Sequence, residues 1–234
     1  MKPLKITILL SSPIAFPIKV KPYPLMFDSI LIELMAQRAG RFDYDYNEYD
    51  SYSPENNERG VPLAVGGTRK KFYRASAIEV PKAEHTSLSI VSRTDWPEEQ
   101  EIEKCAKWKR EVIYVGSGLY RNSRELMPGI IAPIVNFYCV GDKEKIEDLL
   151  SDLKAIGVKT AIGMGRVEKV VVKEIAEDYS VIDKNGNPAR PIPFDEHPGR
   201  GGWLRDYCSY KPPYWLIDNK DMCWIPPMYR WYPL

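Results

Sequence analysis

The sequence predicts an α+β protein with the ferredoxin-like (RRM-like) order βαββαβ, a strand-rich insertion, and an irregular C-terminal extension rich in proline and aromatic residues. Three observations support this. An alternating strand pattern opens the chain and precedes an amphipathic helix. A second strand and helix follow at residues 134–157, and a glycine-rich loop then leads into a β-branched run at 167–175.

The first strand is expected at residues 5–10, because its side chains alternate between two faces. The apolar positions Ile6, Ile8 and Leu10 alternate with Lys5, Thr7 and Leu9. The first helix is expected to begin with Asp28 as its N-cap and to end at Gly40.

The second strand–helix pair carries the clearest local signals. Residues 134–141 are β-branched and aromatic, which is typical of a buried strand. Asp142 is a favourable N-cap for a helix whose apolar face continues to Gly157. A final strand is predicted at 167–175, followed by a turn at 184–187.

The remaining segments suggest how the chain is divided. We expect a main domain over residues 1–187, with an inserted strand-rich middle at about 41–130, and an extension over 188–234 that packs on it. Residues 41–60 are acidic and rich in tyrosine, 72–94 favour strand, and 97–110 favour helix. The extension is too apolar for a disordered linker and should wrap irregularly over the domain.

The composition excludes several classes of function. The 33 basic and 32 acidic residues leave a net charge of +1, so a polyanion would have to be held by locally clustered charge. The four cysteines form no C-x-x-C pair and only two histidines are present, so we expect no zinc site and no cofactor. No apolar stretch approaches the roughly 18 residues of a membrane span, which predicts a cytoplasmic protein without membrane contact.

A glycine-rich loop with two cations is the first candidate site. Gly163 and Gly165 would let the backbone approach a phosphate with exposed N–H groups, while Lys159 and Arg166 supply positive charge. The alternative is a tight helix-to-strand connection with glycine at the helix end, which is the commoner explanation for such a loop taken alone.

A basic stretch with aromatic residues inside it is the second candidate. Arg69, Lys70, Lys71 and Arg74 bracket Phe72 and Tyr73. The cations could follow a nucleic-acid backbone while Phe72 or Tyr73 stacks on a base. The alternative is a solvated strand face. Weaker candidates of the same kind are Lys19, Lys21, Arg121 and Arg124.

The sequence contains few candidate catalytic residues. His85 with Ser87 or Ser89, or with a nearby lysine, could perform the acid–base chemistry of metal-independent RNA cleavage. A single histidine without an identified partner is more often a surface or structural residue, so we expect no catalytic site.

Several segments, in their order along the chain, resemble the CRISPR-associated RAMP superfamily. The segments are PLMFDSILIELMAQRAG, GSGLYRNSRELMPGIIAPIVNFYCVGDKEKIEDLL, IGVKTAIGMGRV, PARPIP and YKPPYW. The chain is most similar to the subunit of type IV CRISPR effector complexes that binds the 5′ handle of the guide RNA. The acidic insertion at 41–60 matches nothing in that pattern.

The resemblance implies a non-catalytic RNA-binding subunit of an antiviral or anti-plasmid ribonucleoprotein complex. Its loop at Lys159, Gly163, Gly165 and Arg166 would contact guide RNA, and the subunit would cap a filament of backbone RAMP subunits beside a large subunit. DNA would be met only through the complex. Two alternatives stay open: a RAMP endoribonuclease that processes precursor guide RNA with His85 as general acid or base, and a small-molecule enzyme on the same fold.

Overall fold

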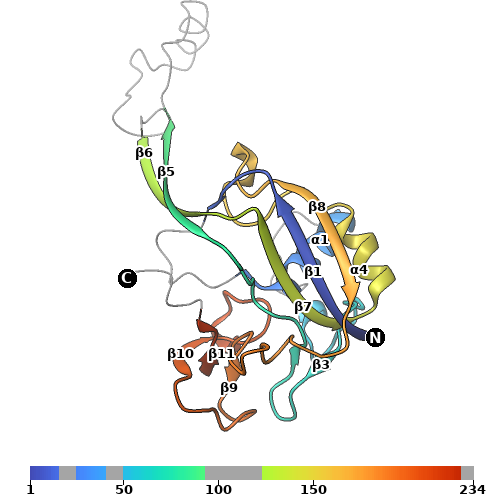
Figure 1. Cartoon of the computed structure of the whole chain (residues 1–234). Coiled ribbons are helices and arrows are strands. Elements are labelled where there is room, and N and C mark those ends of the chain that lie inside the picture. Colours follow the sequence, from blue (N-terminus) through green and yellow to red (C-terminus); the bar gives the residue numbers. More distant parts are fainter. Residues whose placement is uncertain (16–24, 41–49, 93–122, 228–234) are drawn as a thin grey trace, which may run out of the picture.

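A three-stranded antiparallel sheet forms the centre of the computed structural model, which describes residues 1–15, 25–40, 50–92 and 123–227 (Figure 1). Strand β1 (Lys2–Leu10) lies between β7 (Ile134–Gly141) and β8 (Val167–Glu174). All three strands occur where the sequence patterns predict them. The predicted α+β class is therefore confirmed.

One face of this sheet is covered by helices α1 (Phe27–Arg38) and α4 (Lys143–Leu150), which lie behind it in Figure 1. The inward side chains of β1, Leu4, Ile6 and Ile8, have no exposed surface and share one hydrophobic core with residues of both helices. The alternate side chains of β1, which are Pro3, Lys5, Thr7 and Leu9, are on the opposite face, which we call the open face.

The end of α4 differs from the prediction. Asp142 is the N-cap, since its carboxylate accepts the Lys145 N–H at 3.3 Å, but the helix ends at Leu150 rather than near Gly157. Gly157 has a φ of +89°, and a Cβ there would lie 2.8 Å from Ile14 Cγ2. This glycine serves close packing against β2 (Ile14–Ala15), not a helix end.

The start of α1 also differs. The N-cap is Met26, and Asp28 lies inside the first turn with a fully buried side chain. The pattern that suggested a cap therefore reflects a buried polar contact, which is described below.

The fourth position of the sheet is occupied by an irregular segment. Ala75 and Glu79 form isolated antiparallel bridges to Cys139 and Asn136 of β7, and they follow the short hairpin β3 (Val65–Gly66) and β4 (Phe72–Tyr73). The described sheet thus has three regular strands. The complete ferredoxin-like topology, which needs four, stays a prediction.

The inserted middle contains a long hairpin that projects away from the sheet (Figure 1). Strand β5 (Glu84–Ser92) pairs with β6 (Ser123–Ile131), which also pairs with β2. The helix predicted at 97–110 lies outside the described residues. Short 3₁₀ turns occur at η1 (Asp50–Tyr52), η3 (Thr160–Ile162) and η4 (Ile217–Asn219).

The C-terminal extension is more regular than predicted. Strands β9 (Ile192–Pro193), β10 (Leu204–Ser209) and β11 (Lys220–Ile225) form an antiparallel sheet in the order β10-β11-β9. Cys208, Tyr210, Cys223 and Ile225 pack with Phe72 in a second small core. The expected irregular wrapping is therefore wrong for these residues, whereas the proposed domain boundary at 187 stays a prediction.

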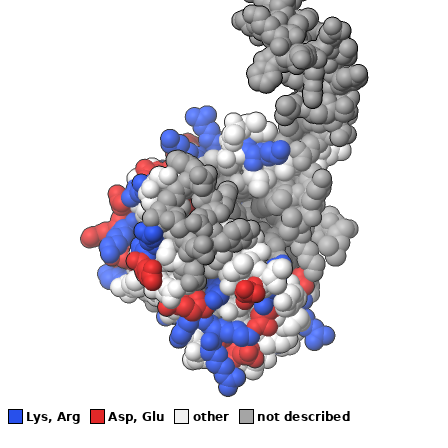
Figure 2. Space-filling model, turned by 180° about the vertical axis from the view of Figure 1, so that it is seen from behind, with Lys and Arg blue, Asp and Glu red and all other residues white. Residues whose placement is uncertain are grey.

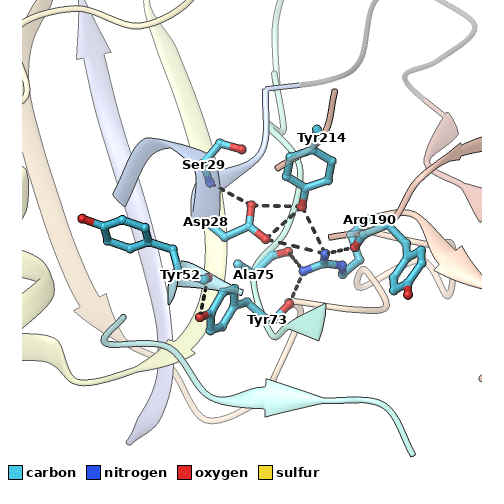
Figure 3. Close-up of polar contacts among 8 residues, drawn as sticks. Asp28, Ser29, Tyr52, Tyr73, Ala75, Arg190 and Tyr214 are labelled. Carbon is cyan, nitrogen blue, oxygen red and sulfur yellow. Dashed lines mark hydrogen bonds and ion pairs between the residues drawn. The ribbon is translucent and has the colours of Figure 1, made fainter. Parts of the chain in front are cut away.

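A buried polar network joins the extension to the main sheet (Figure 3). The Arg190 guanidinium donates to the carbonyl oxygens of Tyr73, Ala75 (2.9 Å) and Tyr210 (2.6 Å). It also lies 3.6 Å from the Asp28 carboxylate, which accepts the Tyr214 hydroxyl at 2.9 Å. Four distant parts of the chain thus meet at one cation.

Candidate RNA interface

The glycine-rich loop connects α4 to β8 at the end of the sheet where β1 finishes, in gold in Figure 1. Lys159, with φ +59°, and Gly163, with φ +90°, both have left-handed backbone conformations on either side of η3. Residues 159–163 and Arg166 are exposed to solvent. The cationic loop is therefore accessible, as a contact with RNA requires.

The two glycines of this loop differ in role. Gly165 is buried, and a Cβ at this position would lie 1.8 Å from the Ile156 carbonyl oxygen. At Gly163, by contrast, nothing lies within 4 Å of an added Cβ. The tight-connection explanation accounts for Gly165, while Gly163 lies on the open side of the loop.

The backbone N–H groups in the second half of the loop are used within the chain. Gly163 donates to the Thr160 carbonyl at 3.0 Å, Gly165 to the Pro13 carbonyl at 2.7 Å, and Arg166 to Ser12 Oγ at 2.8 Å. The expected phosphate cradle of free N–H groups at Gly163 and Gly165 is therefore not formed. A phosphate at this loop would be held by side chains, chiefly those of Lys159 and Arg166.

The second predicted site, the hairpin β3–β4, has most of its charge balanced internally. The Glu196 carboxylate accepts the N–H groups of Thr68, Arg69 and Lys70 at 2.6, 2.6 and 2.7 Å. Although partial burial acts to raise the pKa of Glu196, these donations together lower it. The turn of the hairpin is thus anchored to the C-terminal extension.

The cations of this stretch are paired in the same way. Lys70 forms ion pairs with Asp195 (3.1 Å) and Asp221, and Arg74 pairs with Asp178. The Lys71 ammonium donates to the Gly67 carbonyl at 2.8 Å. These contacts weaken the case for the stretch as a nucleic-acid surface and leave Arg69 as its exposed cation.

The aromatic residues of the stretch cannot stack on bases. Phe72 and Tyr73 are 4% and 0% exposed. The Phe72 ring packs 4.8 Å from the Arg190 guanidinium, and the Tyr73 hydroxyl donates to the Tyr52 carbonyl at 2.9 Å. The hypothesis that either one is a stacking platform is wrong, because Tyr73 belongs to the main core and Phe72 to the small core of the C-terminal extension.

The two predicted sites lie at opposite ends of the central sheet. The Ser11 N–H, just after β1, donates to the Arg166 carbonyl, whereas Leu63, which precedes the hairpin, bridges Gly141 opposite Lys2. They do not form one surface. Lys19, Lys21 and Arg121 lie outside the described residues, and for Arg124 the structure describes only the backbone, which pairs with Val91.

His85 is exposed in β5, opposite Ile130 of β6. Ser87 and Ser89 follow at intervals of two and are therefore on the same face of the strand.

Among the described residues, no group of three His, Cys, Asp or Glu side chains is arranged to hold a metal ion. No described helix has the length and apolar character needed to cross a membrane.

The helix-covered side of the molecule carries charges of both signs. Figure 2 shows Lys and Arg side chains interspersed with Asp and Glu over much of this side. One such contact joins Arg38 of α1 to Asp148 and Asp152 at the end of α4. This side therefore has no extended basic surface within the described residues that it displays.

The open face carries cations that belong to no sequence motif. Opposite residues of antiparallel strands share one face, and Lys5 lies opposite both Tyr138 and Lys173. Leu9 likewise lies opposite Ile134 and Lys169. The alternation of residues 5–10 already predicted an outward position for Lys5, whereas Lys169 and Lys173 lie in a β-branched run without alternation and are assigned to this face by the strand register.

A comparison with known protein families shows the family to which this chain belongs. The model of the CRISPR type IV associated protein Csf3 matches residues 2–228. The chain belongs to the Csf3 family. The predicted membership of a type IV CRISPR family is therefore confirmed. A comparison with curated proteins found no match.

Among solved structures, the Csf3-family chain is similar to one in a complex described as the type III-B Cmr-beta bound to cognate target RNA. The identity is 9% and the TM-score 0.36, with 75% of this chain and 62% of that chain covered. The chain thus spans less than two thirds of the length of that protein.

Proposed function

We propose that this protein is a non-catalytic, RNA-binding subunit of a type IV CRISPR effector complex that binds the 5′ handle of the guide RNA and caps the backbone filament. The observation that carries the proposal is the match to the Csf3 family over residues 2–228. The exposed cations of the loop at 159–166 provide the contact with RNA.

The loop is suited to backbone contacts. Its main-chain N–H groups at 163–166 are occupied, so the shape of the loop is fixed before RNA arrives. The Arg166 guanidinium has no ion pair among the described residues and is free to contact a phosphate bidentately. Such contacts fix the position of a strand without reading its sequence.

The partner proteins of the proposal require exposed apolar surface. On the projecting hairpin β5–β6, Val91 is 52% and Leu126 is 56% exposed. Large apolar side chains exposed on an extended hairpin are suited to burial against another protein. In the proposal, backbone subunits and the large subunit cover this surface.

The ferredoxin-like arrangement of a RAMP protein, with residues 75–79 at the fourth sheet position, is part of the same proposal.

The test is RNA binding by the purified protein and its complex. Arg166→Ala should weaken binding of single-stranded RNA carrying the 5′ handle and reduce the salt dependence of binding by about 0.7 in slope. Arg205→Ala, which removes an exposed arginine of β10, is the matched control. Equal affinity and slope for both variants and the parent protein would contradict a role for the loop.

A further inference from the structure

Three lysines gather on the open face of the central sheet, near the cationic loop. Lys5 and Lys173 are cross-strand neighbours, and Lys169 lies four residues before Lys173, about 13 Å along the strand. Arg166 directly precedes β8, so the cations continue along this strand from the loop. Figure 1 looks onto this face, with the helices on the far side.

These lysines differ from the other cations in how they are paired. Arg38, Lys70 and Arg74 each contact a carboxylate of the same chain. Within the part of the chain that the structure describes, Lys169 and Lys173 have no ion-pair partner, and the Lys5 ammonium has only a distant contact, 6.0 Å from the Tyr138 ring centre. Their charge is therefore available to a ligand.

Val171, opposite Thr7, lies between Lys169 and Lys173 on β8, while the polar groups beside them on β1 and β7 are held in place. Thr7 Oγ1 donates to the Asn136 side-chain oxygen at 3.0 Å, and Asn136 Nδ2 donates to the Glu79 carboxylate at 3.0 Å. The Tyr138 hydroxyl donates to the same carboxylate at 2.9 Å. Glu79, the acid at this edge, is thus engaged by two donors, and the sheet surface is pre-organised.

Aromatic and apolar surface lies beside the cations. The Tyr138 ring is partly exposed and is held edge-on to Tyr179 with ring centres 5.7 Å apart. At the other end of the same strand, Ile134 is 41% exposed beside partly exposed Leu9. Unpaired cations, a fixed aromatic ring and apolar patches are the groups that contact the phosphates and bases of single-stranded RNA.

We propose that the open face holds a single-stranded RNA segment that continues from the loop at 159–166, with its phosphates on Lys169, Lys173 and Lys5 and a base against Tyr138. This inference rests on the proposed function and adds a second contact surface to it. A protein partner is the less suitable occupant, because it would need carboxylates placed opposite all three lysines, whereas every nucleotide of an RNA strand carries a phosphate.

The test compares two triple variants with equal loss of charge. Lys5, Lys169 and Lys173 are replaced by alanine in one, and Lys143, Lys145 and Arg205, which lie away from the open face, in the other. Binding of single-stranded RNA carrying the 5′ handle is measured at several salt concentrations, with thermal unfolding as the folding control. The open-face variant should bind at least tenfold more weakly, with a salt slope reduced by about 2. The other variant should change much less.

Two substitutions of Tyr138 probe the aromatic ring. Tyr138→Phe keeps the ring and should retain most of the affinity, while Tyr138→Leu removes the stacking surface and should weaken binding severalfold. RNA–protein cross-links to residues 134–138 are expected in the parent protein.

Each other outcome overturns a defined part of the account. If the parent protein binds RNA and the two triple variants bind it equally, the open-face inference is wrong while the proposed function stands. If the open-face variant keeps RNA but no longer joins the effector complex, the face docks a protein and the inference is equally wrong. If the parent protein binds no RNA, alone or in the complex, both proposals fall.

Discussion

Arg190 and Asp28 form an ion pair of 3.6 Å in which neither side chain has any exposed surface. Burial raises the pKa of the Asp28 carboxyl, and the facing Arg190 guanidinium and the Tyr214 hydroxyl act against this rise. The pair links α1 to the C-terminal extension, and through the Tyr73 and Ala75 carbonyls it also holds the segment beside β7. The position of the extension on the sheet therefore depends on one buried cation.

Removing either partner should destabilise the protein strongly. Asp28→Asn and Arg190→Met each leave the other member of the pair buried without its counter-charge, which typically costs about 3–5 kcal/mol. Urea unfolding followed by tryptophan fluorescence measures the loss. Arg38→Ala, which removes exposed ion pairs with Asp148 and Asp152, is the control and should cost much less than either buried change. Equal effects of the buried and exposed changes would contradict the role given to Arg190.

The anchoring of the β3–β4 hairpin should depend on pH through Glu196. Because the folded-state pKa of Glu196 is lowered below its ordinary value of 4.5, its contribution is complete above that pH and is lost as the pH falls through the folded pKa. Glu196→Gln should therefore cost about 1 kcal/mol at pH 7 and less at pH 3. A stability difference between parent and variant that stays constant over this range would argue against the contact.

The two glycines of the loop should respond differently to alanine. Gly165→Ala places a Cβ against the Ile156 carbonyl and should reduce stability by several kcal/mol or prevent folding. Gly163→Ala meets no neighbour and should cost only about 1 kcal/mol, the price of a left-handed conformation for a residue with a side chain. Thermal unfolding of both variants distinguishes them, and similar losses would mean that the loop is packed differently.

Cleavage of precursor RNA should be absent and independent of His85. In the proposed non-catalytic role, repeat RNA incubated with the protein in EDTA stays intact, and His85→Ala leaves RNA binding unchanged within twofold. Denaturing gels and filter binding provide the readouts. A discrete cut in the repeat that His85→Ala abolishes would instead identify the endoribonuclease.

Local patterns were sufficient to predict the elements of the central sheet. The β-branched run at 167–175, the bounded apolar strand at 134–141 and the cap at Asp142 each act over a few residues, and the structure has all three. The exposed position of the loop at 159–163 was also predictable from local sequence, because a connection between a helix and a strand lies at the surface.

Long-range contacts were beyond the reach of these patterns. In the sequence Asp28 resembles a helix cap, but in the structure it pairs with Arg190. Lys70 likewise resembles a free cation in the sequence, but in the structure it pairs with Asp221. The burial of Phe72 and Tyr73 likewise depends on the extension and main core that cover them. Of the open-face lysines, Lys5 was predictable from the alternation of β1, whereas Lys169 and Lys173 needed the strand register because the run of β8 does not alternate.

The most direct test is to map where the guide RNA touches this subunit in the assembled complex, by ultraviolet cross-linking and mass spectrometry. We expect nucleotides of the 5′ handle to be attached to peptides containing residues 159–166. A guide RNA that cross-links to the other subunits but nowhere on this chain would contradict the account.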